Sequence, residues 1–259
     1  MQVLYATDMD RTIIFSKRFM EEYPPTSPYD VAETKNDRII SYISVPVKKK
    51  LNELCRHKNV QVIPVTTRSI DEFNRINIGL NNKYAIVSNG GTILENGKPM
   101  KEWEEYIHKN GNRMSLMCAL LDLEELTSVC RDVTIIDGKY LFTKTDDEER
   151  FDLEVQHLIE KYRSLTFTRQ RKKIYVVPKS FSKAIALRWL QNKLGVDKLV
   201  ASGDSELDLP MLAIADYAII PEHGDLIKEG FILDGRIVKS GIDSSLKTMQ
   251  TVEEIANDN

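Results

Sequence analysis

The sequence contains few cysteines and histidines, and neither residue type forms a metal-binding pattern. Its three cysteines, Cys55, Cys118 and Cys130, show no CxxC spacing, and its four histidines form no HExxH pair. A zinc site is therefore not expected. An odd number of scattered cysteines indicates reduced thiols, as in the cytoplasm, instead of a disulfide framework.

The sequence also lacks long apolar runs and a strong excess of one charge. No apolar stretch approaches the roughly 20 residues of a membrane span, and the N-terminal segment is expected to form a strand, not a signal peptide. The net charge of -3 gives no basic field for nucleic acid. The 259 residues, 42% of them hydrophobic and 29% charged, are typical of a soluble globular protein with a sizeable core. We therefore expect neither a membrane nor a nucleic acid as partner.

The most informative segment runs from Val3 to Thr12. Its apolar and β-favouring residues end in two acids, Asp8 and Asp10, which predicts a buried strand that delivers carboxylates to the edge of a sheet. Two such close carboxylates repel, and a hard cation such as Mg²⁺ would allow both to ionise. Asp8 could then attack an electrophile while Asp10 donates or accepts a proton. The alternative is that both acids merely cap a loop or a helix.

Other predicted strands also end in polar residues. The strand at 60–65 is followed by Thr66, Thr67 and Arg68, and the strand at 84–88 by Asn89. Helix capping by Thr67 or its neighbour Ser69 is the plainer interpretation of the first group.

A third acidic group, with Asp204 and Asp208, follows the strand predicted at 198–202. Ligands of open α/β sheets bind beyond the carboxyl ends of the strands, so we expect these strand ends to share one crevice. Lys183, at the start of a helix predicted over 182–194, could balance the carboxylates or bind phosphate. Taken by itself, an ordinary surface lysine is the plainer interpretation.

The pattern between residues 98 and 178 departs from βα alternation. It predicts helices at 114–129 and 151–162, a hairpin that turns at Asp137-Gly138, and two strands joined by the basic turn 169–172. We therefore predict an α/β protein with a Rossmann-like core and parallel sheet over 1–97 and 179–259. An α/β domain with an antiparallel sheet is inserted at 98–178. The proline-rich segment 16–45 could form a flap over the acids or a plain surface excursion.

These motifs together resemble the haloacid dehalogenase-type phosphatases, in particular the large-cap (C2, or IIB) group with Cof-type and sucrose-phosphatase-like enzymes. The segment Asp8-Met9-Asp10-Arg11-Thr12 is similar to the family's DxDxT motif, and Gly203 to Asp208 to its GDxxxD motif. Thr66 and Lys183 match the hydroxyl and the lysine of the two motifs between them. The resemblance covers almost the whole chain. It departs from many relatives at Arg11, where they carry glycine, and at Leu207, where many carry asparagine.

The resemblance implies a role for each matched residue. Asp8 would be the nucleophile that becomes an aspartyl-phosphate, and Asp10 would protonate the leaving alcohol and then activate water. Mg²⁺ would be held by Asp8, the backbone carbonyl of Asp10 and Asp204, with support from Asp208. Thr66 and Lys183 would hold phosphoryl oxygens. The residues expected to position the loop or contact substrate are Thr12, Thr67, Arg68 and Asn89.

The sequence thus predicts a cytoplasmic Mg²⁺-dependent phosphatase for a small phosphate ester, with a sugar phosphate as the leading substrate class and a monomer or weak dimer as the assembly. The inserted cap should set specificity. A phosphomutase and a non-catalytic phospholigand-binding module are the alternatives. A signalling receiver domain shares the residue types, but it is about half this length and has no cap.

Overall fold

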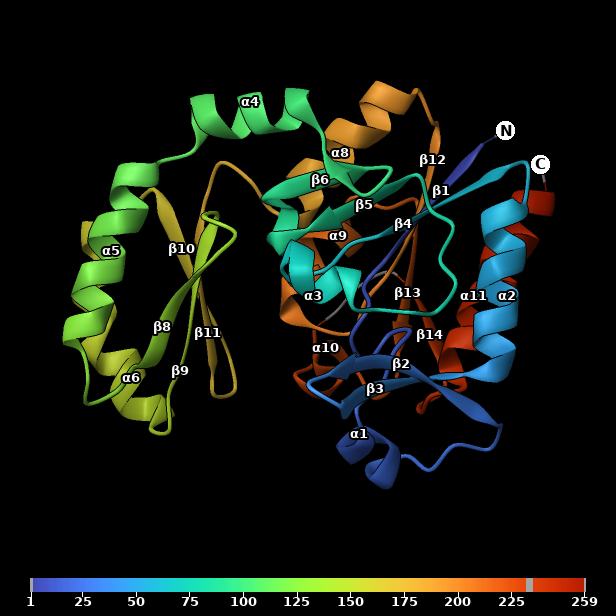
Figure 1. Cartoon of the computed structure of the whole chain (residues 1–259), viewed down its shortest axis with the longest axis horizontal. Helices are drawn as coiled ribbons and strands as arrows, with labels where there is room; N and C mark the ends of the chain where they lie inside the picture. The colour runs from blue at the N-terminus through green and yellow to red at the C-terminus, as the bar shows by residue number, and fades with distance from the viewer. Residues whose placement is uncertain (1, 232–234, 259) are drawn as a thin grey trace.

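The central sheet is parallel, and β1 lies in it between β12 and β4. The computed structural model describes residues 2–231 and 235–258, and in them five strands form a sheet of order β14-β13-β12-β1-β4, in which every neighbouring pair is parallel (Figure 1). The predicted Rossmann-like core is thereby confirmed. The strands are β1 (Val3–Thr7), β4 (Val60–Pro64), β12 (Lys198–Ser202), β13 (Tyr217–Pro221) and β14 (Arg236–Val238).

Both faces of this sheet are buried, which explains why β1 is a continuous apolar run. Leu4 and Ala6 belong to one hydrophobic cluster and Val3 and Tyr5 to the other, as the period of two along a strand requires. The first cluster contains residues of α8 (Lys183–Leu194) and α9 (Leu209–Ala213). The second contains residues of α2 (Val45–Arg56) and α11 (Ser244–Asn257).

The segment predicted as a flap or surface excursion forms a short helix and a hairpin. Helix α1 (Lys17–Glu22) is followed by β2 (Tyr29–Lys35) and β3 (Arg38–Ser44), which pair antiparallel. Strand β3 covers most of the apolar run at 39–45, for which a short strand or an ordered arm was expected. Strand β2 was not predicted, because its sequence is largely polar and half-exposed.

The predicted third core strand lies outside the central sheet. Strand β5 (Tyr84–Val87) pairs antiparallel with β6 (Thr92–Glu95), which pairs with β7 (Lys98–Pro99). A single parallel bridge between Val65 and Ile86 joins this small sheet to the extension of β4. The short helices at its margins and around the core are η1 (Ser88–Gly90), α3 (Ile70–Asn74), η2 (Glu206–Asp208) and α10 (Asp225–Lys228).

A second, antiparallel sheet confirms the predicted α/β insertion. It has four strands in the order β10-β11-β9-β8 and, together with three helices, is called the cap below. The helix predicted at 151–162 is interrupted at Val155 and forms two helices, and the helix predicted at 114–129 ends at Glu125. The cap elements are α5 (Arg113–Glu125), β8 (Arg131–Ile136), β9 (Tyr140–Lys144), α6 (Glu148–Glu154), α7 (Gln156–Lys161), β10 (Leu165–Gln170) and β11 (Lys173–Pro178).

The two faces of the cap sheet have different neighbours. Ile174 and Val176 of β11 pack with the cap helices, whereas Tyr175 and Val177 belong to the cluster of the core. Figure 1 shows the same layering, with α5 and α6 on the outer face of the cap sheet and the core opposite its other face. The cap sheet therefore turns its inner face towards the carboxyl ends of the core strands.

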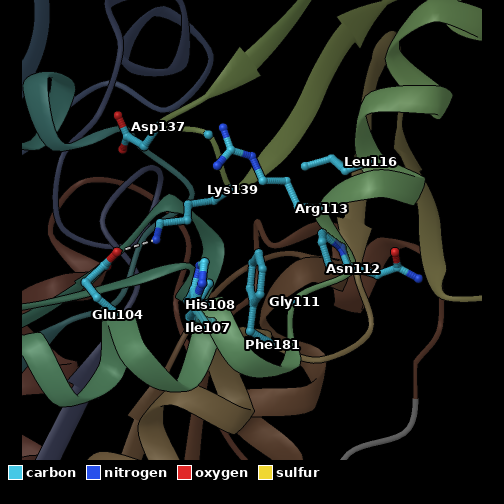
Figure 2. A pocket seen from close by; sticks show the side chains of 12 residues that line it. Glu104, Ile107, His108, Gly111, Asn112, Arg113, Leu116, Asp137, Lys139 and Phe181 are labelled. Carbon is cyan, nitrogen blue, oxygen red and sulfur yellow. Dashed lines mark hydrogen bonds and ion pairs between the residues drawn. The ribbon is translucent and has the colours of Figure 1, made fainter.

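The joint between cap and core contains a cavity of about 300 Å³ (Figure 2). Helix α4 (Lys101–Asn110) leads to this joint, and its buried Trp103 packs in the core cluster. Lys139 Nζ of the cap lies 2.6 Å from Glu104 Oε2 of α4, and both residues line the cavity. The limits at residues 98 and 178 stay a prediction.

Candidate active site

The parallel pairing of β1 with β12 brings the first and last acidic motifs together. Thr7 is in register with Ser202, and the Asp8 amide donates to the Ser202 carbonyl at 2.9 Å. Asp8 and Asp204 therefore follow adjacent strand ends. Together with Asp208 they form a buried cluster in which one carboxylate oxygen from each lies within 4.8 Å of the others.

Lys183 lies within this acidic cluster. Its Nζ donates to Asp8 Oδ1 and to Asp208 Oδ1, both at 2.6 Å, and its side chain is only 2% exposed. Burial disfavours the charged lysine, but the carboxylates of Asp208 and Asp8 outweigh burial and raise the pKa of Lys183. The ammonium group is therefore protonated and available as a point charge beside Asp8. Ser182 fixes its position by capping α8 through a bond to the Ile185 amide.

The carboxylates outnumber the cations at this cluster. Burial, and next the carboxylate of Asp208, raise the pKa of Asp8 to about 7. Burial also raises the pKa of Asp204 well above its ordinary value, although Arg11 opposes the shift. Asp204 Oδ2 is buried and accepts no hydrogen bond from the described residues; its nearest cation is Arg11 Nη1 at 3.2 Å. A further positive charge would therefore stabilise the ionised cluster.

Arg11 connects the loop that follows Asp8 to the segment that contains His223 and Asp225. It has a left-handed backbone (φ 62°), and its guanidinium donates to Asp225 Oδ2 and to the His223 carbonyl, both at 2.9 Å. The buried His223 ring lies 2.7 Å from the Arg11 carbonyl and accepts from the Gly241 amide at 3.1 Å through its other nitrogen. His223 thus donates to the Arg11 carbonyl and holds this loop in place. Asp225 also accepts from Arg171 of the cap at 2.7 Å.

Asp10 lies outside the metal-type cluster and is held by Arg68. The Arg68 guanidinium donates to both oxygens of Asp10, at 2.7 and 2.8 Å, and to Glu33 Oε2 at 2.7 Å. Glu33 is buried and accepts a second arginine, Arg75, at 3.0 Å. In the structure, Arg68 therefore pairs with Asp10, the second aspartate of the DxDxT motif. A substrate contact by Arg68 stays a prediction.

The predicted hydroxyl and amide residues surround the cluster at different depths. Thr12 Oγ1 lies 3.5 Å from Asp8 Oδ2, and Thr66 Oγ1 accepts from the Arg68 amide at 3.2 Å. Asn89 is buried and has a left-handed backbone, and its backbone N–H donates to the Thr66 carbonyl at 3.0 Å. Among Thr12, Thr66, Thr67 and Asn89, Thr67 lines the cavity described next.

A cavity of about 550 Å³ lies between the acidic cluster and the cap. Asp8, Asp10, Asp204 and Lys183 line its core side. Its cap side contains residues to which the sequence analysis gave no role, including Gln170, Lys173 and Tyr175. The alternation in β11, in which Ile174 and Val176 face the cap interior, was the available signal that Lys173 and Tyr175 face the site.

Comparison with known proteins identifies the family. The sucrose-6F-phosphate phosphohydrolase family matches residues 46–222. The chain belongs to this family. It is accordingly a phosphatase of the haloacid dehalogenase superfamily, and the resemblance seen in its motifs is confirmed. A search of curated proteins finds no match.

Solved structures share the whole fold at low sequence identity. The sucrose-phosphatase of Synechocystis sp. PCC6803, solved with sucrose and phosphate, is 15% identical with a TM-score of 0.70 and covers 97% of this chain and 98% of its own. A haloacid dehalogenase-like hydrolase from B. subtilis is 15% identical with a TM-score of 0.68, covering 95% and 98%. A subclass IIB sugar phosphatase is 13% identical with a TM-score of 0.60, covering 98% and 99%.

Among the described residues, no helix combines the length and the apolar character that crossing a bilayer requires. All three cysteines are free thiols, as their spacing indicated.

Proposed function

We propose that this protein is a Mg²⁺-dependent phosphatase that hydrolyses a small phosphomonoester, with a sugar phosphate as the leading class, through an aspartyl-phosphate on Asp8. The observation that carries the proposal is the position of Asp8, whose carboxylate lines the cavity while Lys183 contacts one of its oxygens at 2.6 Å. Free thiols support action in the reducing cytoplasm.

The acidic cluster fits a magnesium ion. Asp8 and Asp204 offer carboxylate oxygens close together, and the buried Asp204 Oδ2 has no hydrogen-bond donor among the described residues. Oxygen ligands of this kind suit Mg²⁺. The Asp10 carbonyl is the proposed third protein ligand, and Asp208 supports the cluster by accepting from the Asp204 and Ser205 amides. When bound, the ion supplies positive charge for the phosphoryl oxygens.

The chain's own groups account for the two half-reactions. Asp8 attacks phosphorus, the bond from phosphorus to the ester oxygen breaks, and Asp10 donates a proton to the departing alkoxide. Asp10 then accepts a proton from the water that attacks the aspartyl-phosphate, which releases inorganic phosphate and restores Asp8. Lys183 stabilises the phosphoryl oxygens throughout, and the cap limits access of bulk water.

A phosphomutase is the alternative, because it uses the same acids. Mutase action would return the phosphoryl group to a bisphosphate instead of passing it to water. Release of inorganic phosphate in proportion to ester consumed therefore favours the phosphatase. A non-catalytic binding module would release none.

The test is an Asp8→Asn substitution with Mg²⁺ present. We expect phosphate release to fall at least about a thousandfold, because the amide cannot form the covalent intermediate. Glu206→Gln is the control, since it removes an exposed carboxylate from the same acidic segment but outside the cluster. Normal turnover in Asp8→Asn, or no dependence of the wild type on Mg²⁺, would contradict the proposal.

A further inference from the structure

The cations around the active-site cavity fall into two groups. Those nearest the acidic cluster have acidic partners: Lys183 contacts Asp8, and Arg11 contacts Asp204 and Asp225. Arg18 of α1 and Lys173 of β11 also line the cavity, one from the core and one from the cap. Neither side chain forms an ion pair with any residue that the structure describes. Two cations on opposite walls of the cavity are thus uncompensated.

The other basic residues of the cap hairpin already have partners. Arg169 contacts Glu148 and Asp152 within the cap, and Arg171 contacts Asp225 of the core. Lys172 lies 3.4 Å from Asp146. The basic turn as a whole is therefore not the anion-binding feature, and Lys173 is distinguished from its neighbours by the lack of an acid.

A second cap side chain presents an unsatisfied polar group beside Lys173. Gln170 and Lys173 are cross-strand partners, and Tyr175 follows two residues later on the same face. Gln170 Nε2 is buried without a hydrogen-bond partner among the described residues, in a side chain that lines the cavity. A buried donor without an acceptor is unfavourable by about 1–3 kcal/mol, so a ligand oxygen would stabilise it.

Tyr175 adds an aromatic side chain with a hydroxyl to the cap wall of the cavity. Its side chain is 5% exposed and lines the cavity with Asp8, Asp10 and Lys183. Burial raises the pKa of Tyr175, so the phenol stays protonated as a donor. The cap wall therefore offers an amide donor, a hydroxyl and a cation within one cavity.

We propose that the leaving group of the substrate is a polyhydroxylated body that carries a second anionic group, a carboxylate or a second phosphate. Lys173 and Arg18 bind this second anion, while Gln170 and Tyr175 contact the hydroxylated body. The inference rests on the proposed phosphatase function and defines its substrate class: the phosphate esters of acidic sugars, or sugar bisphosphates.

The experiment compares two matched pairs of esters in the presence of Mg²⁺. Glucose 6-phosphate is compared with 6-phosphogluconate, which adds a carboxylate, and fructose 6-phosphate with fructose 1,6-bisphosphate, which adds a phosphate. We expect the kcat/KM of the wild type to be at least about tenfold higher for the member with the second anionic group in one pair, and the pair that responds distinguishes the two anions. A preference for the member without the second anion in both pairs, or equal values in both, would overturn the inference.

Variants assign the effect to Lys173. Lys173→Met should lower kcat/KM about tenfold or more for the preferred ester with the second anionic group. It should change kcat/KM less than about threefold for the ester of the same pair that lacks this group. The control is Lys49→Met, which removes an exposed lysine from α2, on the side of the core away from the cap (Figure 1). Equal losses on both members of the pair would overturn the inference.

A generic ester separates failure of this inference from failure of the proposed function. Hydrolysis of p-nitrophenyl phosphate needs the machinery around Asp8 but no second anion. If this hydrolysis depends on Asp8 and the selectivity is absent, the inference alone fails. If no ester is hydrolysed, the proposed function fails and the inference with it.

Discussion

At the scale of single residues, the pairing of Arg68 with Asp10 has the most direct bearing on catalysis. The planar guanidinium holds both oxygens of Asp10, and its third nitrogen is anchored on the buried Glu33. Bidentate pairs of this kind fix the orientation of a carboxylate as well as its charge. Arg68 is therefore a positioning residue for the proposed general acid, and the hairpin that carries Glu33 supports it.

We expect Arg68→Lys to lower kcat by about tenfold or more and to change KM less, because a lysine cannot orient Asp10 through two parallel bonds. If Arg68 instead contacts the substrate, as the sequence analysis expected, KM should rise more than kcat falls. Steady-state kinetics with a single ester under Mg²⁺ distinguish the two expectations.

Arg75→Met provides the control for this substitution. Arg75 contacts Glu33 at 3.0 Å but no oxygen of Asp10. It should leave kcat within about threefold of the wild type. An equal fall of kcat in both variants would show that loss of a contact to Glu33, and not the orientation of Asp10, is responsible.

At the scale of elements, the start of α8 depends on a close approach by η1. Gly90 has a φ of 92°, and a Cβ atom there would lie 2.2 Å from the Ser182 carbonyl oxygen and 2.9 Å from the Lys183 amide nitrogen. Only glycine permits both the backbone conformation and the distance. This contact sets the position of Lys183 against Asp8.

Gly90→Ala should lower the free energy of unfolding by about 3 kcal/mol or more and reduce kcat through displacement of Lys183. Gly97→Ala is the matched control, because Gly97 also has a positive φ (76°) but no atom within 4 Å of the added methyl group. It should destabilise the protein by only about 1 kcal/mol. Urea denaturation measures both; similar losses of stability would contradict the role of the close contact.

The sequence predicted those elements whose local pattern and tertiary role agree. Strands β1, β4 and β12 are apolar runs that end in polar motifs, and all three lie in the central sheet. Strand β2 was missed because Glu33 interrupts its pattern and is buried only by its arginine partners. Strand β5 has a core-like pattern, yet it pairs with β6, and local sequence does not encode the choice of partner.

The same limit applies to the site. The acids and Lys183 were found because motif residues follow strand and helix ends. The partners of Arg68 and Arg11 depend on segments distant in the chain, Glu33 and Asp225, which carry no motif of their own. The break in the cap helix at Val155 also has no glycine or proline to signal it.

At the scale of the whole molecule, polar contacts between cap and core accompany the apolar packing of Tyr175 and Val177. Tyr140 donates to the Thr67 carbonyl at 2.7 Å, and Arg171 contacts Asp225 at the same distance on the other side of the cavity. Polar contacts such as these two break and form again readily, and entry of substrate beneath a cap requires this.

Arg171→Gln should change the free energy of unfolding by less than about 1 kcal/mol, since the Arg171 side chain is exposed and Asp225 keeps its contact with Arg11. We expect KM to rise several-fold, because the closed arrangement loses one contact. The control is Arg131→Gln, which removes an exposed ion pair with Asp146 inside the cap. Equal KM values for the two variants would show that the Arg171 contact does not contribute to closure.

The position of β1 between β4 and β12 also determines how the protein can be made. Thr7 and Ser202 are hydrogen-bonded neighbours, although they are 195 positions apart in the chain. A ribosome adds about 5–20 residues per second, so the earliest strand to emerge waits roughly 10–40 seconds for β12. During translation this apolar segment has an unpaired edge until β12 has been synthesised, which exposes the nascent polypeptide to aggregation.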